Sequence, residues 1–189
     1  RVDNKLKLNT QGTDLTWTPN GENDTSLITY VDADVTFVGS DTAPTISETD
    51  VHTAVFLKNI VDDTTGDVTN RVLCAWATVG SDVGWVSLTG VQITETESYG
   101  LRIMLDGNVL SFSIDGTVLT PTSFTKQDGT VISVNSDERL FSAKEGSSGA
   151  VKSVSFRGTG FVDNFAASQA AKAVYATATI VGCKAFLDN

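Results

Sequence analysis

The stretch "YGLRIMLDGNVLSFSIDGTVLTPTSF" at residues 99–124 decides the fold class of this sequence. Apolar residues occupy every second position on both sides of its first Asp-Gly pair: Leu101, Ile103 and Leu105 before it, and Leu110, Phe112 and Ile114 after it. Alternation with a period of two is typical of strands with one buried face, and Asp-Gly between two such runs is a strong hairpin signal. A second Asp-Gly pair follows at residues 115–116, so the stretch predicts two hairpins in succession.

The stretch "LITYVDADVTFVG" at residues 27–39 alternates in the same way. Successive side chains of a strand point to opposite faces, so one set is expected in the core and the other on the opposite face. The apolar, core set is Val31, Ala33, Val35 and Phe37, and the polar set is Tyr30, Asp32, Asp34 and Thr36.

Similar segments recur along the chain at residues 51–61, 71–79 and 84–91, with turn-forming residues between them. Turns about 8–12 residues apart, without alternation of strands and helices, are typical of an antiparallel sandwich. We therefore predict an all-β protein, a jelly-roll sandwich of two packed antiparallel sheets.

Composition narrows the class of protein and its partners. Of the 189 residues, 40% are hydrophobic and 19% are charged, which suits a packed core and not a disordered chain. The formal net charge is −10 and no basic stripe is present, which disfavours nucleic acid as a partner. No apolar run approaches the roughly 18 residues that a membrane span requires. The chain starts at Arg1 rather than Met, so we expect a mature or excised piece of a longer protein.

The two cysteines, Cys74 and Cys183, leave two alternatives open. They either form one disulfide or stay as two buried thiols. The single histidine, His52, has no cysteine or second histidine near it in the sequence, so a His-rich zinc site is not predicted.

Asp32 and Asp34 are the first candidates for chemistry, because they share one strand face. Their spacing suits the acid pair of a glycosidase, in which two carboxyl groups lie about 5–9 Å apart. Jelly-roll glycosidases usually carry a run of the type E-x-D-x-x-E, which this sequence lacks. We therefore predict no catalytic residue.

Aromatic residues are the second candidates, because sugars stack flat C–H faces on aromatic rings. Trp85 has the opposite parity to Val86 and Leu88, so it is expected to point outward, to a sheet face or rim. Tyr30 lies on the polar side of its strand. Trp76 shares the parity of Cys74, which favours its burial beside that residue.

The stretch "VSFRGTGFVDNF" at residues 154–165 predicts a strand, a Gly-Thr-Gly kink and a second extended run. Its lone carboxylate, Asp163, is a surface charge, a calcium ligand or part of a family signature. Three segments together resemble the concanavalin A-like lectin/glucanase superfamily, and most of all its laminin G-like jelly-roll modules in bacterial secreted proteins. These segments are residues 27–44, 99–116 and 151–165, and the resemblance spans roughly residues 27–166.

The resemblance implies a sandwich of two antiparallel sheets, one of them concave, with residues 27–39 and the strand ending in "IDG" in different sheets. Carbohydrate-binding members hold the glycan on the concave face or at the rim. Here those positions would be Trp85, Tyr30, Asp32 and Asp34, with Trp76 and Arg102 as lesser candidates. Members with a structural calcium near the last strand would use Asp163, although Asn164 stands where many relatives have a second Asp.

The resemblance leads us to predict a secreted, monomeric, non-catalytic carbohydrate-binding module in residues 1–166. Its partners would be a polysaccharide, such as a β-glucan, and a tethered glycoside hydrolase or surface protein. Residues 167–189 would be a C-terminal tail, either a linker or a segment folded back on the module. A laminin G-like adhesion or spacer module and a small jelly-roll glycosidase or lyase are the alternatives.

Overall fold

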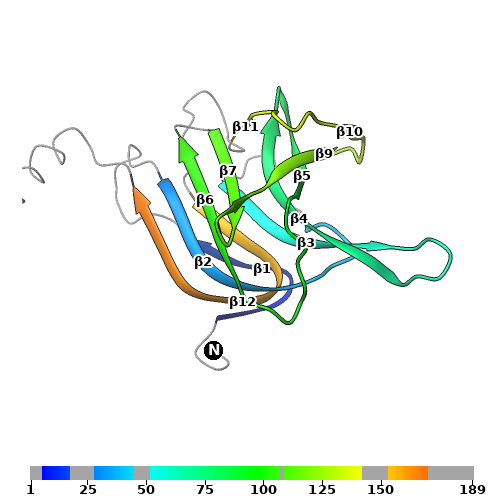
Figure 1. Cartoon of the computed structure of the whole chain (residues 1–189), viewed down its shortest axis with the longest axis horizontal. Coiled ribbons are helices and arrows are strands. Elements are labelled where there is room, and N and C mark those ends of the chain that lie inside the picture. Colours follow the sequence, from blue (N-terminus) through cyan, green and yellow to red (C-terminus); the bar gives the residue numbers. More distant parts are fainter. Residues whose placement is uncertain (1–5, 18–27, 45–51, 107–108, 142–152, 170–189) are drawn as a thin grey trace, which may run out of the picture.

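The computed structural model describes residues 6–17, 28–44, 52–106, 109–141 and 153–169. These residues form strands and no helix, which confirms the all-β prediction (Figure 1). The strands are β1 (Leu6–Trp17), β2 (Ile28–Val38), β3 (His52–Val61), β4 (Val68–Val79), β5 (Asp82–Thr89), β6 (Tyr99–Asp106), β7 (Val109–Ile114), β8 (Thr117–Val118), β9 (Thr120–Lys126), β10 (Val131–Ser133), β11 (Leu140–Phe141) and β12 (Ser153–Gln169). The described residues therefore contain no helix that is long and apolar enough to cross a membrane.

Hydrogen bonds link these strands into one sheet in the order β1-β12-β2-β6-β7-β11-β4-β5-β9-β10. Every described strand pair is antiparallel except β3 with β12, which is parallel. Strand β3 pairs with both β12 and β4. The run from β12 through β2, β6, β7, β11 and β4 therefore returns to β12 through β3. The strands thus form a closed circuit, and closure removes exposed edges from the strands within it.

Strand β12 makes this closure possible, because it changes partner along its length. Residues 153–156 pair with β3, and from Thr159 onward the same strand pairs with β2. The change falls at the predicted Gly-Thr-Gly kink, but β12 is one continuous strand rather than two. It ends at Gln169, three residues past the predicted boundary at 166, because Ala167, Ser168 and Gln169 still pair with β2. The rest of the predicted tail, residues 170–189, lies outside the described residues.

The hairpins predicted in residues 99–124 are present, with one difference in pairing. Strands β6 and β7 form the first hairpin, and β7 and β8 form the second around Asp115 and Gly116. After β8 the chain leaves this meander, because β9 pairs with β5. The strand that ends in "IDG" is β7, which lies beside β6 and only one strand away from β2. The expectation that residues 27–39 and this strand belong to different sheets is therefore wrong.

The main core follows the predicted alternation. In β2 the four apolar residues are buried, whereas Tyr30, Asp32, Asp34 and Thr36 are half-buried on the opposite face. All the remaining strands of the circuit whose side chains are described contribute buried residues to the same cluster. These include Val55 and Leu57 from β3, Leu73 and Ala75 from β4, Leu101 and Ile103 from β6, Leu110, Phe112 and Ile114 from β7, and Leu140 from β11.

A second, smaller apolar cluster lies on the opposite face of β3, β4 and β5. Its members alternate in sequence with core residues of the same strands: Ala54, Phe56, Cys74, Trp76 and Trp85. The prediction that Trp76 is buried with Cys74 is confirmed, since each is 2% exposed.

The prediction that Trp85 points outward is half right. Its ring does lie on the face opposite to Val86 and Leu88, but it is only 8% exposed. Edge-to-face contacts with Phe56 and Trp76, at centroid distances of 4.6 and 5.4 Å, bury it.

Candidate functional site

The candidate site lies on the face of β2, β6 and β7 that points away from the main core. The strand register brings polar residues into rows across these strands. Asp32 of β2 lies opposite Arg102 of β6, and Arg102 lies opposite Ser113 of β7. The next row pairs Asp34 with Gly100, and the row on the other side pairs Tyr30 with Met104. Residues far apart in sequence thus form one continuous surface, which is polar except at the Tyr30–Met104 row.

Asp32 and Arg102 form a bidentate ion pair at the centre of this surface. The Nε and Nη2 atoms of Arg102 donate hydrogen bonds of 2.6 and 2.7 Å to the two carboxylate oxygens of Asp32. These hydrogen bonds and the charge of Asp32 raise the pKa of the Arg102 guanidinium. The guanidinium also lies over the ring of Tyr30, with its Cζ 5.7 Å from the ring centroid. Tyr30, Asp32 and Arg102 are therefore held together as one group.

Asp115 is fixed at the other end of the surface by the turn between β7 and β8. Its φ is 48° and that of Gly116 is 81°, as a two-residue hairpin turn with two positive φ angles requires. The backbone N–H of Gly100 donates a 2.8 Å hydrogen bond to Asp115 Oδ1, and Asp115 N–H donates a 2.9 Å bond to the Gly100 carbonyl. The carboxylate is thereby held against β6.

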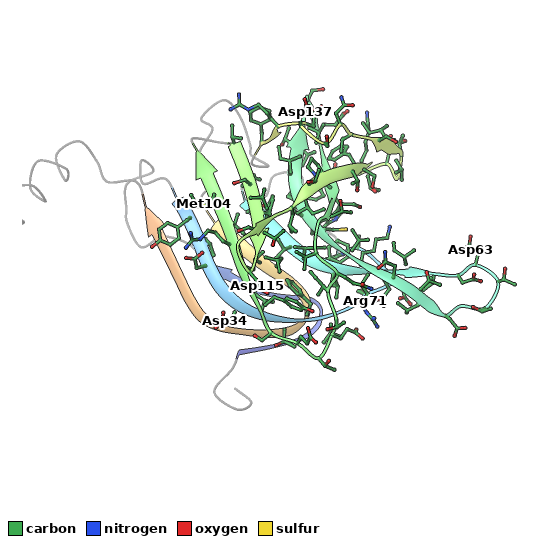
Figure 2. The ribbon with its side chains drawn as sticks, viewed as in Figure 1. Asp34, Asp63, Arg71, Met104, Asp115 and Asp137 are labelled. Carbon is green, nitrogen blue, oxygen red and sulfur yellow. The ribbon has the colours of Figure 1, made fainter. Side chains whose placement is uncertain are left out.

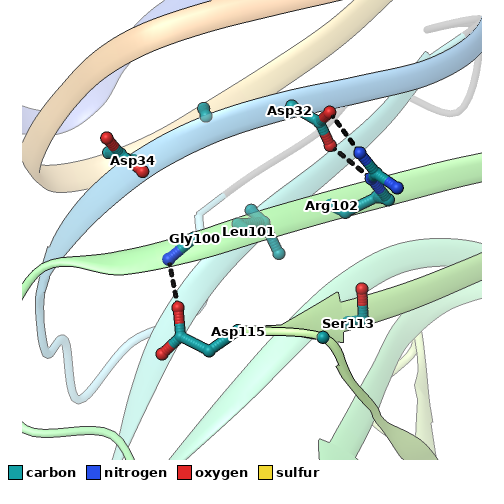
Figure 3. Close-up of a pocket in the computed structure, with 9 residues that line it drawn as sticks. Asp32, Asp34, Gly100, Leu101, Arg102, Ser113 and Asp115 are labelled. Carbon is teal, nitrogen blue, oxygen red and sulfur yellow. Dashed lines mark hydrogen bonds and ion pairs between the residues drawn. The ribbon is translucent and has the colours of Figure 1, made fainter.

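A groove of about 460 Å³ runs between these two groups. It is lined by Asp32, Ala33, Asp34, Gly100, Leu101, Arg102, Ser113, Asp115 and Gly116. Figure 3 shows Asp34 and Asp115 on either side of Gly100, with the Asp32–Arg102 pair farther along the same strands. Because Gly100 has no side chain, the row between Asp34 and Asp115 is left open, and this gap forms part of the groove.

The structure brings together four of the residues predicted from the sequence, namely Tyr30, Asp32, Asp34 and Arg102. It does not bring Trp85 or Trp76 to them, because both tryptophans lie in the second apolar cluster. Asp163 pairs with Asp34 along the backbones of β12 and β2, but its side chain lies outside the described part of the chain.

The sequence reasoning missed Asp115, Gly100 and Ser113 as site residues. From the sequence, the Asp-Gly pair at residues 115–116 predicts only a turn. Its place at the end of β7, one strand from the polar face of β2, is the signal that could have identified Asp115.

A second polar cluster ties the end of β2 to the β3–β4 hairpin. Glu95 accepts hydrogen bonds from Gly39 N–H at 2.6 Å and from Arg71 Nη2 at 2.7 Å. Asn59 Nδ2 donates a 2.9 Å hydrogen bond to Asp41. Figure 2 shows Arg71 where the hairpin leaves the body of the protein. A hollow of about 620 Å³ lies beside it, but Arg71, its charged lining residue, is held by Glu95, so we assign this cluster a structural role.

The described residues contain no group of three His, Cys, Asp or Glu side chains that could hold a metal ion. The possible disulfide between Cys74 and Cys183 is not tested, because Cys183 lies outside the described residues. Within the described residues Cys74 is a buried thiol that forms no disulfide. It lies 3.8 Å from Ser87 Oγ. Burial raises the pKa of this thiol to about 11, so it is a structural and not a reactive cysteine.

Comparisons of this chain with protein-family models, with curated proteins and with solved structures found no match.

Proposed function

We propose that this chain is a secreted, non-catalytic carbohydrate-binding module with a concanavalin A-like jelly-roll sandwich fold. The observation that carries the proposal is the groove on β2, β6 and β7, with the Asp32–Arg102 pair, Asp34, Ser113 and Asp115 along it. The all-β, mainly antiparallel pairing of the described strands around one main core is the feature that supports this fold. Polysaccharide would be the ligand, and a tethered catalytic domain or surface protein would be the partner.

The chemistry of the groove suits sugar hydroxyl groups. A hydroxyl group donates one hydrogen bond and accepts two, so it pairs with carboxylates, guanidinium groups and other hydroxyls alike. Strands β2, β6 and β7 hold these groups in place before a ligand arrives, which lowers the entropy cost of binding. Next to the ion pair, Tyr30 and the 43% exposed Met104 add an apolar row against which a sugar face would pack.

The two hydrogen bonds that Asp32 accepts from Arg102 favour binding over hydrolysis. A glycosidase needs one carboxyl group that donates a proton and one that acts as base or nucleophile. Both oxygens of Asp32 accept hydrogen bonds from Arg102, which would have to be broken before Asp32 could protonate a leaving group. We therefore propose Tyr30, Asp32, Asp34, Arg102, Ser113 and Asp115 as ligand contacts and no catalytic residue. Trp85 is not included, because its ring is covered.

The adhesion alternative is favoured by a different feature, the far end of the β3–β4 hairpin. This hairpin extends beyond the rest of the sheet, and Asp63 lies near its tip (Figures 1 and 2). Ile60, Val61 and Val68 on it are 37–40% exposed. Exposed apolar side chains on a projecting hairpin suit contact with another protein, as an adhesion module would require.

Affinity electrophoresis against soluble β-glucans, xylans and mannans tests the proposed function. We expect at least one glycan to retard the wild-type chain, and Arg102→Ala to remove the retardation. Lys126→Ala is the matched control, because Lys126 forms a comparable exposed ion pair of 2.6 Å with Asp82 outside the groove. Absence of retardation by every glycan would contradict the proposal. Release of reducing sugar would favour the glycosidase instead.

A further inference from the structure

We propose that the groove selects glycans without acidic groups and rejects those that carry carboxylate or sulfate. This inference rests on the proposed function, since it concerns the ligands of the same groove. It follows from how the charges of the groove are arranged and not from the acidity of the chain as a whole.

The positive charge of the groove is already engaged. Among the described residues that line the groove, Arg102 is the only cation, whereas three carboxylates line it: Asp32, Asp34 and Asp115. Acidic sugars are recognised best by the fork of a guanidinium group, which binds a carboxylate through two parallel hydrogen bonds. Here the Nε and Nη2 side of that fork is occupied by Asp32. A uronic acid would have to displace Asp32 to make the same contact.

The opposite end of the groove would repel an acidic ligand. Asp115 is held there by the hydrogen bond from Gly100 and by its turn, so it cannot swing away without losing that bond. Asp34 lies across Gly100 from it (Figure 3). A ligand carboxylate seated over Gly100 would approach the carboxylate of Asp115, and like charges close together disfavour binding. A neutral hydroxyl group would instead donate a hydrogen bond to Asp115.

The test compares one glycan in two charge states. The probe is the soluble glucan, xylan or mannan that most retards the wild-type chain, used unmodified and after carboxymethylation. We expect the carboxymethylated form to bind at least about tenfold more weakly than the unmodified form at low salt. The difference should shrink as salt is added, because exposed charges are screened.

Asp115→Asn tests whether the charge of Asp115 causes the weaker binding of the carboxymethylated glycan. Its amide oxygen can still accept the Gly100 hydrogen bond, whereas the charge is lost. We expect this variant to recover at least about threefold in affinity for the carboxymethylated form. Asp63→Asn, on the projecting hairpin, changes the net charge equally and is expected to recover nothing.

Three results would overturn the inference. Equal or tighter binding of the carboxymethylated glycan would show that the groove does not reject acids, and the proposed function would stand. Equal recovery by both Asn variants would assign the effect to the net charge of the chain. If no unmodified glycan retards the wild type, the proposed function itself fails, and this inference fails with it.

Discussion

Gly100 and Asp115 are joined by two hydrogen bonds: the Gly100 N–H donates to the side-chain Oδ1 of Asp115, and the backbone N–H of Asp115 donates to the Gly100 carbonyl. This contact fixes the turn after β7 against β6. The same contact shapes the groove, because it holds the carboxylate of Asp115 beside Gly100, which has no side chain.

Replacement of Asp115 should separate the role of its conformation from that of its charge. Asp115→Ala is expected to destabilise the fold by about 1–2 kcal/mol, because alanine tolerates a φ of 48° poorly and cannot accept the Gly100 hydrogen bond. Asp115→Asn should stay within about 0.5 kcal/mol of wild type, since asparagine meets both requirements. Urea unfolding measures the stability of both variants. Equal stability of the two variants would contradict the role given to the turn.

Gly39→Ala is expected to destabilise the chain by roughly 1–3 kcal/mol. An added Cβ would overlap Asn59 Oδ1 and lie 2.8 Å from Asn59 Cγ, forcing Asn59 away from Asp41. In the double variant Gly39→Ala, Asn59→Ala the overlap is gone, so its destabilisation should be smaller than the sum of the two single effects. Strict additivity in urea unfolding would show that the two residues do not interfere.

Gly84→Ala is the comparison for that experiment. Its Cβ would overlap the backbone oxygen of Thr125, which no side-chain truncation can remove. We expect a comparable or larger loss of stability without rescue by a second substitution.

The buried Cys74 thiol should make the stability fall at alkaline pH. Its pKa in the folded chain is about 11, above the ordinary value of 9.0, so below pH 9 both folded and unfolded chains keep the proton. Between pH 9 and 11 the unfolded chain loses the proton first, and unfolding becomes easier by up to roughly 1.4 kcal/mol per pH unit.

Urea unfolding at pH 8 and pH 10.5, with Cys74→Ala as the comparison, isolates this contribution. Wild type should lose more stability than Cys74→Ala over that interval. Equal losses would mean that Cys74 does not titrate with folding.

Trp85→Ala should destabilise the fold by about 3–5 kcal/mol, because it empties the centre of the second apolar cluster. Trp85→Phe keeps an aromatic ring against Phe56 and Trp76 and should cost less. Thermal unfolding and glycan affinity of the folded Trp85→Phe variant are the measurements. A stable Trp85→Phe protein that had lost glycan binding would show that Trp85 contacts the glycan, against the site proposed above.

The sequence predicted those features that depend on local periodicity. Alternation placed Val31, Ala33 and Val35 in the core and Tyr30, Asp32 and Asp34 on the opposite face, because strand geometry alone decides this. The Asp-Gly pair likewise identified its own turn. For the same reason, parity placed Trp85 on the correct face of β5.

The remaining features depend on long-range pairing, which periodicity does not contain. Asp32 and Arg102 are 70 residues apart, and only the β2–β6 register makes them partners. The change of partner within β12 is of the same kind. The burial of Trp85 depends on Phe56 and Trp76, which belong to two other strands.

A titration of the ¹⁵N-labelled chain with the most strongly retarding glycan, followed by two-dimensional NMR, tests the central claim most directly. The account predicts that amide shifts concentrate at Asp32, Asp34, residues 100–102 and residues 113–116. It also predicts that Gly100→Val abolishes them in a chain that stays folded, because the new side chain fills the gap and its Cβ, 3.2 Å from Asp115 Oδ1, crowds that carboxylate. Shifts confined to the hairpin at residues 60–70, or shifts that persist in Gly100→Val, would contradict a glycan site in this groove.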